Sequence, residues 1–221
     1  MQKLSSPNDL IKKAVTLFFK KENLIFLVKI YIPAGMVALL VVGQSYLPSS
    51  ITDSNSIWWL STVVLLQILS GLVSIFVAIS GIIALGKVVS GGELSVKKTY
   101  ELAWKQYWKF ALFSIVSGLI YVFGFTLLII PAVIFGVWFI FSRFLFIEKK
   151  MGIKESLLKS KEMVKGIFWK VLGRCVVFGV FAIIVQMLLG IIPFGIGSVL
   201  VSLVGAVYIL PIYLLYLEVK G

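Results

Sequence analysis

The residue types that most enzymes use for acid–base or metal chemistry are nearly missing from this sequence. Its 221 residues include no histidine, one cysteine (Cys175) and nine acidic residues. Histidine is the commonest general base, and zinc and haem sites draw mainly on histidine and cysteine. The sequence also lacks the G-x-x-x-x-G-K-[ST] motif that cradles nucleotide phosphates. We therefore predict that the protein is not an enzyme, that it has no catalytic residues, and that it holds neither a metal ion nor a cofactor.

Three polar residues interrupt long apolar stretches: Lys29, Gln67 and Gln186. Lys29 lies about five residues into the first stretch, so its long side chain can extend to the membrane surface. Glutamine in a membrane helix commonly bonds a neighbouring helix, which we expect of Gln67 and Gln186. No acidic residue lies deep in any apolar stretch. This argues against transport that couples to protons or sodium ions through a buried carboxylate.

Lysine and tryptophan residues gather at the margins of the apolar stretches, where they can contact anionic lipid. Each lysine near an anionic leaflet contributes about 1 kcal/mol of attraction, and tryptophan rings favour the membrane–water interface. The candidate anionic-lipid interface comprises Lys12, Lys13, Lys97, Lys98, Lys105, Lys109, Lys165, Lys170, Trp104, Trp108 and Trp169. Two other interpretations stay open: linkers that only fix the topology, and a docking surface for a membrane or cytoplasmic partner protein. Nucleic-acid binding is not expected, because the net charge of +12 is spread along the membrane margin.

The composition of the chain indicates that these residues belong to an integral membrane protein. The chain is 60% hydrophobic and 14% charged, whereas soluble domains are about 25% charged. A spanning helix needs about 20 apolar residues. Proline residues at 131 and 193 divide two stretches that are too long for one crossing. We predict a single transmembrane domain over 1–221 with six helices, at about 24–46, 57–86, 110–129, 131–147, 171–190 and 194–217.

The distribution of cations predicts the orientation in the membrane. Twenty of the 21 lysine and arginine residues fall before the first span, between the second and third, between the fourth and fifth (from Arg143 to Arg174), or after the sixth. The three connections on the other side of the membrane contain a single charged residue, Asp53. Because positive charge stays on the cytoplasmic side, we expect both termini in the cytoplasm. We predict a multi-pass protein of the cytoplasmic (inner or plasma) membrane of a prokaryote.

The sequence repeats one unit three times, at about 8–87, 92–148 and 152–218. Each unit begins with a cationic amphipathic segment, at 10–24, 95–110 and 152–170, and continues into two spans. In the second and third units, Trp-Lys precedes Ile-Ile-Pro, with 23 and 24 residues from Trp to Pro. The predicted fold class is all-α: six transmembrane helices as three hairpins in parallel pseudo-repeats. A cationic amphipathic helix precedes each hairpin, with its apolar face in the headgroup layer.

The segment 127–174 resembles the membrane domain of the glycerophosphoryl diester phosphodiesterase type, which also occurs as stand-alone prokaryotic membrane proteins. The resemblance depends on the apolar hairpin with Ile-Pro, Glu148 at a helix end, the run Gly-Ile-Lys-Glu-Ser-Leu, Ser160, and Lys-Gly-Ile-Phe-Trp-Lys at 165–170. It implies a six-helix membrane domain. It does not imply phosphodiesterase activity, which in that family belongs to a separate soluble domain with histidines and paired acids.

Two functional hypotheses follow from these patterns. The first is a non-enzymatic membrane protein that organises anionic lipid or a partner protein at the cytoplasmic face. The alternative is a permease or channel component for a small solute, suggested by parallel repeats around a shared axis. The alternative requires a water-accessible cavity lined by Ser, Gln and Lys29, and a dry centre of Leu, Ile and Phe would argue against it.

Overall fold

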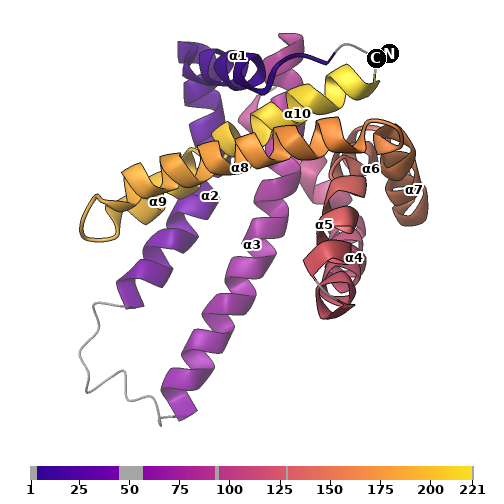
Figure 1. Ribbon diagram of the computed structural model, residues 1–221. Coiled ribbons are helices and arrows are strands. Elements are labelled where there is room, and N and C mark those ends of the chain that lie inside the picture. The colour runs from indigo at the N-terminus through magenta and orange to yellow at the C-terminus, as the bar shows by residue number, and fades with distance from the viewer. Residues whose placement is uncertain (1–3, 45–56, 93–94, 128, 221) are drawn as a thin grey trace.

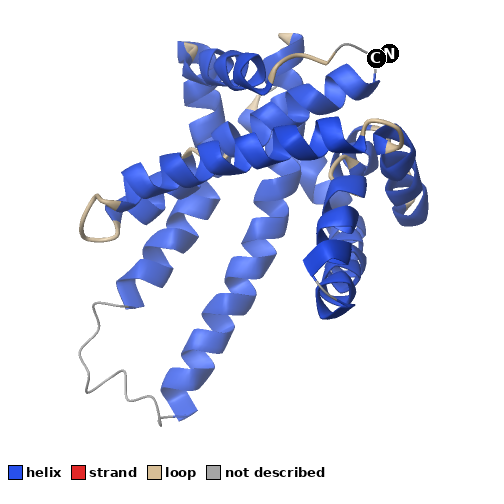
Figure 2. Cartoon of the chain, in the orientation of Figure 1, coloured by secondary structure: helices blue, strands red, loops and turns tan. Residues whose placement is uncertain are grey.

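The computed structural model describes residues 4–44, 57–92, 95–127 and 129–220, and all regular structure in these ranges is α-helical (Figure 2). The helices are α1 (Pro7–Phe19), α2 (Lys21–Gln44), α3 (Ile57–Ser90), α4 (Val96–Leu127), α5 (Ile129–Trp138), α6 (Ser142–Glu148), α7 (Ile153–Val164), α8 (Phe168–Gly190), α9 (Ile196–Leu203) and α10 (Ala206–Lys220). The all-α class predicted from the sequence is confirmed.

Within the described ranges, six helical stretches are long and apolar enough to cross a membrane. They are α2, α3, α4 (Val96–Thr126), α5 with α6 (Ile130–Glu148), α8, and α9 with α10 (Ile196–Lys220). The helices expose many large apolar side chains, among them Trp58 (84% exposed) and Phe194 (75% exposed). Such exposure suits contact with lipid rather than water. The chain therefore has the architecture of a multi-pass membrane protein.

Several helix boundaries differ from those expected. The amphipathic segment 95–110 is not a separate helix, because α4 continues unbroken from Val96 to Leu127. No glycine or proline occurs between 95 and 117 to interrupt it. By contrast, α7 is separated from α8 at Gly166, whose φ of +88° is a conformation that glycine adopts readily. The spans expected at 131–147 and 194–217 each consist of two consecutive helices.

The helices diverge from one crowded region. Figure 1 shows α2 and α3 extending downward, α4 and α5 extending down on the right, and α8 and α9 extending to the left. The region they share contains α1, α6 and α10, with α7 beside it. We call this region the cationic end, because Lys12 and Lys13 of α1, Lys149 and Lys150 after α6, and Lys220 of α10 lie there.

The core at the cationic end is built from aromatic rings. Phe18, Phe141, Phe144 and Tyr216 are completely buried, and the ring centroids of Phe144 and Tyr216 lie 5.2 Å apart. Aromatic side chains bury large areas of surface and pack in tilted or edge-on arrangements of this kind. This core joins α1, α6 and α10, so it determines where the last residues of α6 lie.

Two glycines make room for a tyrosine in the interior. Tyr31 of α2 is 4% exposed. A Cβ atom at Gly81 of α3 would lie 2.6 Å from the Tyr31 hydroxyl oxygen, and a Cβ atom at Gly205 would lie 2.6 Å from Tyr31 Cε1. Both distances are too short for a side chain to be added without movement. The ring of Tyr31 therefore fits only because glycine, which has no side chain, occupies these positions in α3 and at the α9–α10 junction.

This arrangement predicts opposite effects of two glycine substitutions in the same helix. Gly81→Ala should lower the free energy of unfolding by about 1–2 kcal/mol, because the new methyl group overlaps Tyr31. Gly71→Ala should leave it unchanged or raise it by up to about 1 kcal/mol, since nothing lies within 4 Å of a Cβ there. Denaturation by sodium dodecyl sulfate in mixed micelles measures both. Equal effects of the two substitutions would contradict the close packing of Tyr31.

Candidate functional site

Three lysines from two parts of the chain line one recess at the cationic end. The recess has a volume of about 210 Å³. We call it the lysine pocket; it is lined by Lys105, Gln106, Lys109, Phe146, Lys150 and Met151. The three lysine side chains are exposed, so their ammonium groups stay hydrated. No carboxylate lines the recess in the described part of the chain, which leaves three like charges facing one space.

The helical period of α4 explains the position of two of these lysines. Residues four apart lie on the same face of a helix, so Lys105 and Lys109 point to the same side. The opposite face packs against the bundle: Tyr107 is 6% exposed, and its hydroxyl donates a hydrogen bond of 3.1 Å to the carbonyl of Leu72 in α3. Because that face is buried, the lysines of α4 are directed outward.

Ring packing between α4 and α6 brings the third lysine to the same place. The ring of Phe146 in α6 lies 5.9 Å from that of Phe110 and 4.8 Å from that of Phe113, both in α4. The chain leaves α6 at Glu148, and Lys150 follows with a φ of +53°. This left-handed conformation is uncommon for a residue with a side chain. The turn that contains this left-handed residue places Lys150 beside α4.

A hydrogen-bonded cluster holds the end of α6 just before this turn. The carboxylate of Glu148 accepts hydrogen bonds from the hydroxyls of Tyr213 and Tyr216, the latter at 3.2 Å, and pairs with the ammonium of Lys220 at 3.2 Å. Tyr213 and Tyr216 are 3% and 0% exposed. The carboxylate of Glu148 supplies the hydrogen-bond acceptor that each of these buried hydroxyls needs. The cluster therefore anchors α6 to α10, two residues before Lys150.

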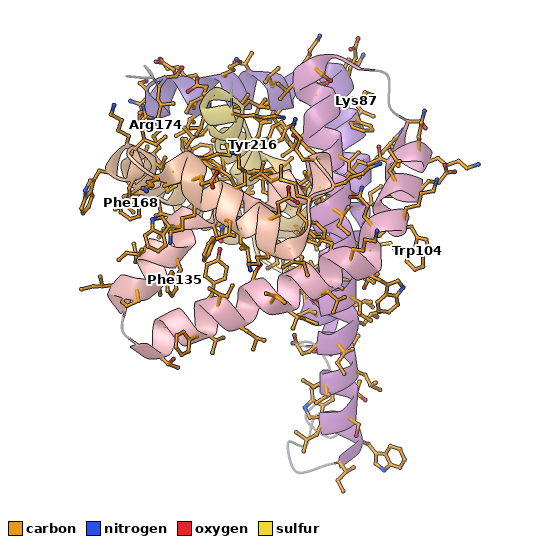
Figure 3. All side chains as sticks on the ribbon, turned by 90° about the vertical axis from the view of Figure 1, so that its right-hand side faces the viewer. Lys87, Trp104, Phe135, Phe168, Arg174 and Tyr216 are labelled. Atoms are coloured by element: carbon orange, nitrogen blue, oxygen red, sulfur yellow. The ribbon has the colours of Figure 1, made fainter. Side chains whose placement is uncertain are left out.

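An apolar hollow lies next to the lysine pocket. It is lined by Phe76, Tyr100, Glu101, Trp104 and Lys105, with a volume of about 460 Å³. We call Phe76, Tyr100 and Trp104 the aromatic ledge. Trp104 is 66% exposed, and Figure 3 shows it pointing away from the helices. Because Lys105 lines both hollows, charged and apolar surfaces meet there, as a phospholipid headgroup and its acyl chains require.

The structure brings together only part of the interface expected from the sequence. Lys105 and Trp104 line these two adjoining hollows, with Lys109 in the lysine pocket, and Trp108 lies beside Lys109, 72% exposed. The other expected residues are exposed but lie outside these two hollows, most of them in other elements. These are Lys12 and Lys13 in α1, Lys97 and Lys98 in the first turn of α4, Lys165 after α7, and Trp169 and Lys170 in the first turn of α8.

Each amphipathic segment buries part of its apolar face against neighbouring helices. The expected contact of these faces with the headgroup layer stays a prediction. A helix that can bury its apolar face in a protein core does not need lipid to cover it. The buried residues are Leu10, Ala14 and Phe18 in α1, Ala103 and Tyr107 in α4, and Leu157 and Val164 in α7.

The intramembrane polar residues lie on outer surfaces. Lys29, Gln67 and Gln186 are all exposed. The expected hydrogen bonds of the two glutamines to neighbouring helices stay predictions. The hydroxyl of Tyr100 donates a hydrogen bond of 2.9 Å to the backbone carbonyl of Lys29, which joins α4 to α2. Within the described residues, no three His, Cys, Asp or Glu side chains are placed to hold a metal ion.

The residues that position the site were not among the candidates predicted from the sequence. Lys150 was counted only as a topology signal, and Glu148 only as part of a family resemblance. Arg174 was also missed: its guanidinium donates to the carbonyls of Leu4, at 3.1 Å, and Ser5, at 2.7 Å. The Lys149-Lys150 pair directly after an acid at a helix end is the sequence signal that could have identified this turn.

Comparison with known proteins adds no identification. Neither a family model, nor a curated protein, nor a solved structure matches the chain. The class defined by the fold is a multi-pass α-helical membrane protein with a lysine-lined recess. The resemblance of 127–174 to the membrane domain of glycerophosphoryl diester phosphodiesterases stays a prediction.

The Glu148 cluster predicts a graded loss of stability. Glu148→Ala should lower the free energy of unfolding by about 1–3 kcal/mol, because it leaves the buried hydroxyl of Tyr213 without an acceptor. Glu148→Gln should cost less, since an amide oxygen can still accept that hydrogen bond. Glu162→Ala is the matched control: this acid is exposed and, among the described residues, forms an ion pair with Lys159 alone, so its removal should change stability by less than about 1 kcal/mol. Equal losses for Glu148→Ala and Glu162→Ala would refute the anchoring role.

Proposed function

We propose that the protein is a non-enzymatic integral membrane protein that binds anionic phospholipid at the cytoplasmic face, through the lysine pocket and the aromatic ledge. The observation that carries the proposal is the convergence of Lys105, Lys109 and Lys150, from two separate segments, on one recess. Three neighbouring ammonium groups repel one another unless an anion lies between them. A lipid phosphate supplies that anion, and the ledge accepts the upper part of its acyl chains.

We propose a topology in which this pocket faces the cytoplasm. The support is the concentration of cations at one end, where lysines of α1, α4, the turn after α6 and α10 occur. The hydrogen bonds from Ser5 to Glu218 also keep the first and last described segments together at that end. We further propose that α2–α3, α4–α5/α6 and α8–α9/α10 are the hairpins of three parallel repeats in a prokaryotic cytoplasmic membrane.

The lipid proposal predicts a specific effect of neutralising the pocket. The triple variant Lys105→Gln, Lys109→Gln, Lys150→Gln should weaken binding of phosphatidylglycerol roughly a hundredfold, because each lysine contributes about 1 kcal/mol. The measurement is quenching of tryptophan fluorescence by brominated phosphatidylglycerol in phosphatidylcholine vesicles. Trp104→Phe identifies the part of the signal that arises at the ledge.

A second triple variant separates the pocket from general charge. Lys20→Gln, Lys21→Gln, Lys154→Gln removes the same charge from exposed positions between α1 and α2, in α2 and in α7, and it should retain most of the lipid binding. Equal loss in both variants would mean that the charge acts diffusely, and the pocket proposal would fail. If both triple variants keep lipid binding, and a soluble protein binds only when the pocket lysines are present, the partner-protein interpretation would be favoured.

The proposed orientation is tested by cysteine labelling in a Cys175→Ala background. Asp53→Cys should react with an impermeant maleimide from outside the cell, although position 53 lies outside the described residues. Lys13→Cys, on an exposed position of α1, should react only after the membrane is opened. The reverse pattern would invert the topology and exclude binding at the cytoplasmic leaflet.

One observation supports the alternative of a permease or channel component. A recess of about 320 Å³ between α2, α3 and α9 is lined by four serines, Ser70, Ser74, Ser198 and Ser202, together with alanine and valine side chains. If this recess is part of a solute path, Ser74→Leu should slow the swelling of proteoliposomes in glycerol. Swelling no faster than that of protein-free liposomes would exclude the alternative for this solute.

A further inference from the structure

Another recess at the cationic end is lined by charges of both signs. It has a volume of about 600 Å³, which lies within the range of pockets that hold small molecules. Two lysines and one glutamate line it, so we call it the mixed-charge recess, whereas the charged residues that line the lysine pocket are all lysines. The lining residues are Leu17, Lys20, Glu22, Asn23, Lys87, Val88, Gly91, Gly92 and Ser95.

Hydrogen bonds at helix ends hold the walls of this recess. The side-chain amide of Asn23 donates to the carbonyl of Leu17 at 2.9 Å, which fixes the junction of α1 and α2. Gly91 has a φ of +71°, and its amide donates to the carbonyl of Lys87 at 2.8 Å, so α3 ends in a left-handed glycine cap. The hydroxyl oxygen of Ser95 accepts a hydrogen bond of 3.2 Å from an amide in the first turn of α4. Three segments that are separate in the sequence thus bound one space.

The positions of Glu22 and Lys87 favour their charged forms. Glu22 lies in the first turn of α2, and Lys87 lies in the last turn of α3. The helix dipole favours a carboxylate at an N-terminus and an ammonium at a C-terminus. The ammonium nitrogen of Lys87 also lies 4.1 Å from the centroid of the Phe26 ring in α2, and Figure 3 shows Lys87 near the upper end of α3. The recess therefore presents an anion and a cation from two different helices.

The carboxylate of Glu22 is available to a ligand. Glu22 is exposed, and the ion pairs between described residues, Lys159–Glu162 and Lys220–Glu148, do not include it. A simple anion in this recess is repelled by the carboxylate, and a simple cation is repelled by the lysines. A molecule that has both an ammonium and an anionic group is attracted at both ends.

We propose that the mixed-charge recess binds a small zwitterion, a molecule with one ammonium group and at least one carboxylate or phosphate group. Glu22 binds the ammonium, and Lys87 binds the anionic oxygens. Soluble amino acids have this chemistry, and so does the headgroup of phosphatidylethanolamine. The lining favours a soluble ligand, because Leu17 and Val88 are its large apolar side chains and offer little surface to acyl chains. The site uses no residue of the lysine pocket, so it does not depend on lipid binding there.

The test uses the full-length protein in a neutral maltoside detergent and measures its thermal unfolding temperature against ligand concentration, which gives the affinity. The zwitterionic probes are aspartate and O-phosphoethanolamine. Inorganic phosphate and ethylamine, which each have one of the two charged groups, are the controls at equal ionic strength. At least one zwitterion should raise the unfolding temperature at concentrations where both controls leave it unchanged. Equal stabilisation by inorganic phosphate or by ethylamine overturns the proposal.

Phosphatidylethanolamine distinguishes a lipid headgroup from a soluble ligand. It is added to protein whose lysine pocket is neutralised by Lys105→Gln, Lys109→Gln, Lys150→Gln, with phosphatidylglycerol, which has no ammonium group, as the control lipid. Stabilisation by a soluble probe identifies a soluble ligand, and stabilisation by phosphatidylethanolamine alone identifies a headgroup. Stabilisation by no zwitterion, or equally by phosphatidylglycerol, overturns the proposal.

Glu22→Gln tests the residue that distinguishes a zwitterion from an anion. It should weaken zwitterion binding by about tenfold, as expected for the loss of a hydrogen bond to a charged group, and it should not weaken binding of inorganic phosphate. Because Glu22 is exposed, the ligand-free protein should unfold at the same temperature as before. Glu162→Gln is the matched control, an exposed acid of α7 outside the recess, and it should bind normally. Unchanged zwitterion affinity in Glu22→Gln, or an equal loss in Glu162→Gln, overturns the proposal.

Lys87→Gln tests the cationic side of the recess. It should weaken zwitterion binding by about tenfold, and Lys87→Arg, which keeps the charge, should weaken it less. Unchanged affinity in Lys87→Gln overturns the assignment of the anionic group to this lysine. Glu22→Gln keeps the proposal falsifiable even if Lys87→Gln fails to fold after losing its contact with the Phe26 ring.

Discussion

The cost of placing charge in hydrocarbon is the constraint on which the rest of this structure depends. It allows large apolar side chains such as Trp58 and Phe194 to be exposed, because lipid covers them, and it concentrates lysines at one end of the molecule. Once the cations of several elements are confined to one end, the packing of α4 on α6 is sufficient to bring Lys105, Lys109 and Lys150 together. The lysine pocket therefore follows from the same energetic rule as the topology.

Polar bonds at the cationic end add to the packing between neighbouring spans such as α2 with α3 and α4 with α5. Only 11% of the apolar segment of α8 is buried, so packing along its length does little to position it. Its first turns are instead joined to the N-terminal segment through Arg174, which donates to the carbonyls of Leu4 and Ser5, and Figure 3 shows Arg174 close to α1. Glu218 and Glu148 tie α10 to the same region. Directional bonds thus position α8 and α10, which pack less extensively than α2, α3 and α4 do.

Composition and hydrophobic length were sufficient to predict the all-α class and the six spans, because the bilayer thickness sets the length of an apolar helix. They could not predict which face of an amphipathic helix meets protein: a stripe such as Tyr100, Ala103 and Tyr107 has the same pattern whether it packs on α3 or lies on lipid. The site was only partly predictable. Lys105 and Lys109 share a helix and are recognisable by spacing, whereas Lys150 joins them through the Phe113–Phe146 contact and a left-handed turn.

The unbroken course of α4 has a mechanical consequence. Its 32 residues make a rod about 48 Å long, with the aromatic ledge and the lysine pocket near one end. A rod pivots as a unit, so a tilt of about 5° at the pocket moves the opposite tip by roughly 4 Å over that length. A break after Phe110, as in a helix lying flat before a separate span, would absorb such a tilt at the joint. If the lysine pocket binds lipid as proposed, a tilt of α4 on binding would therefore move the backbone at the opposite end of the same helix.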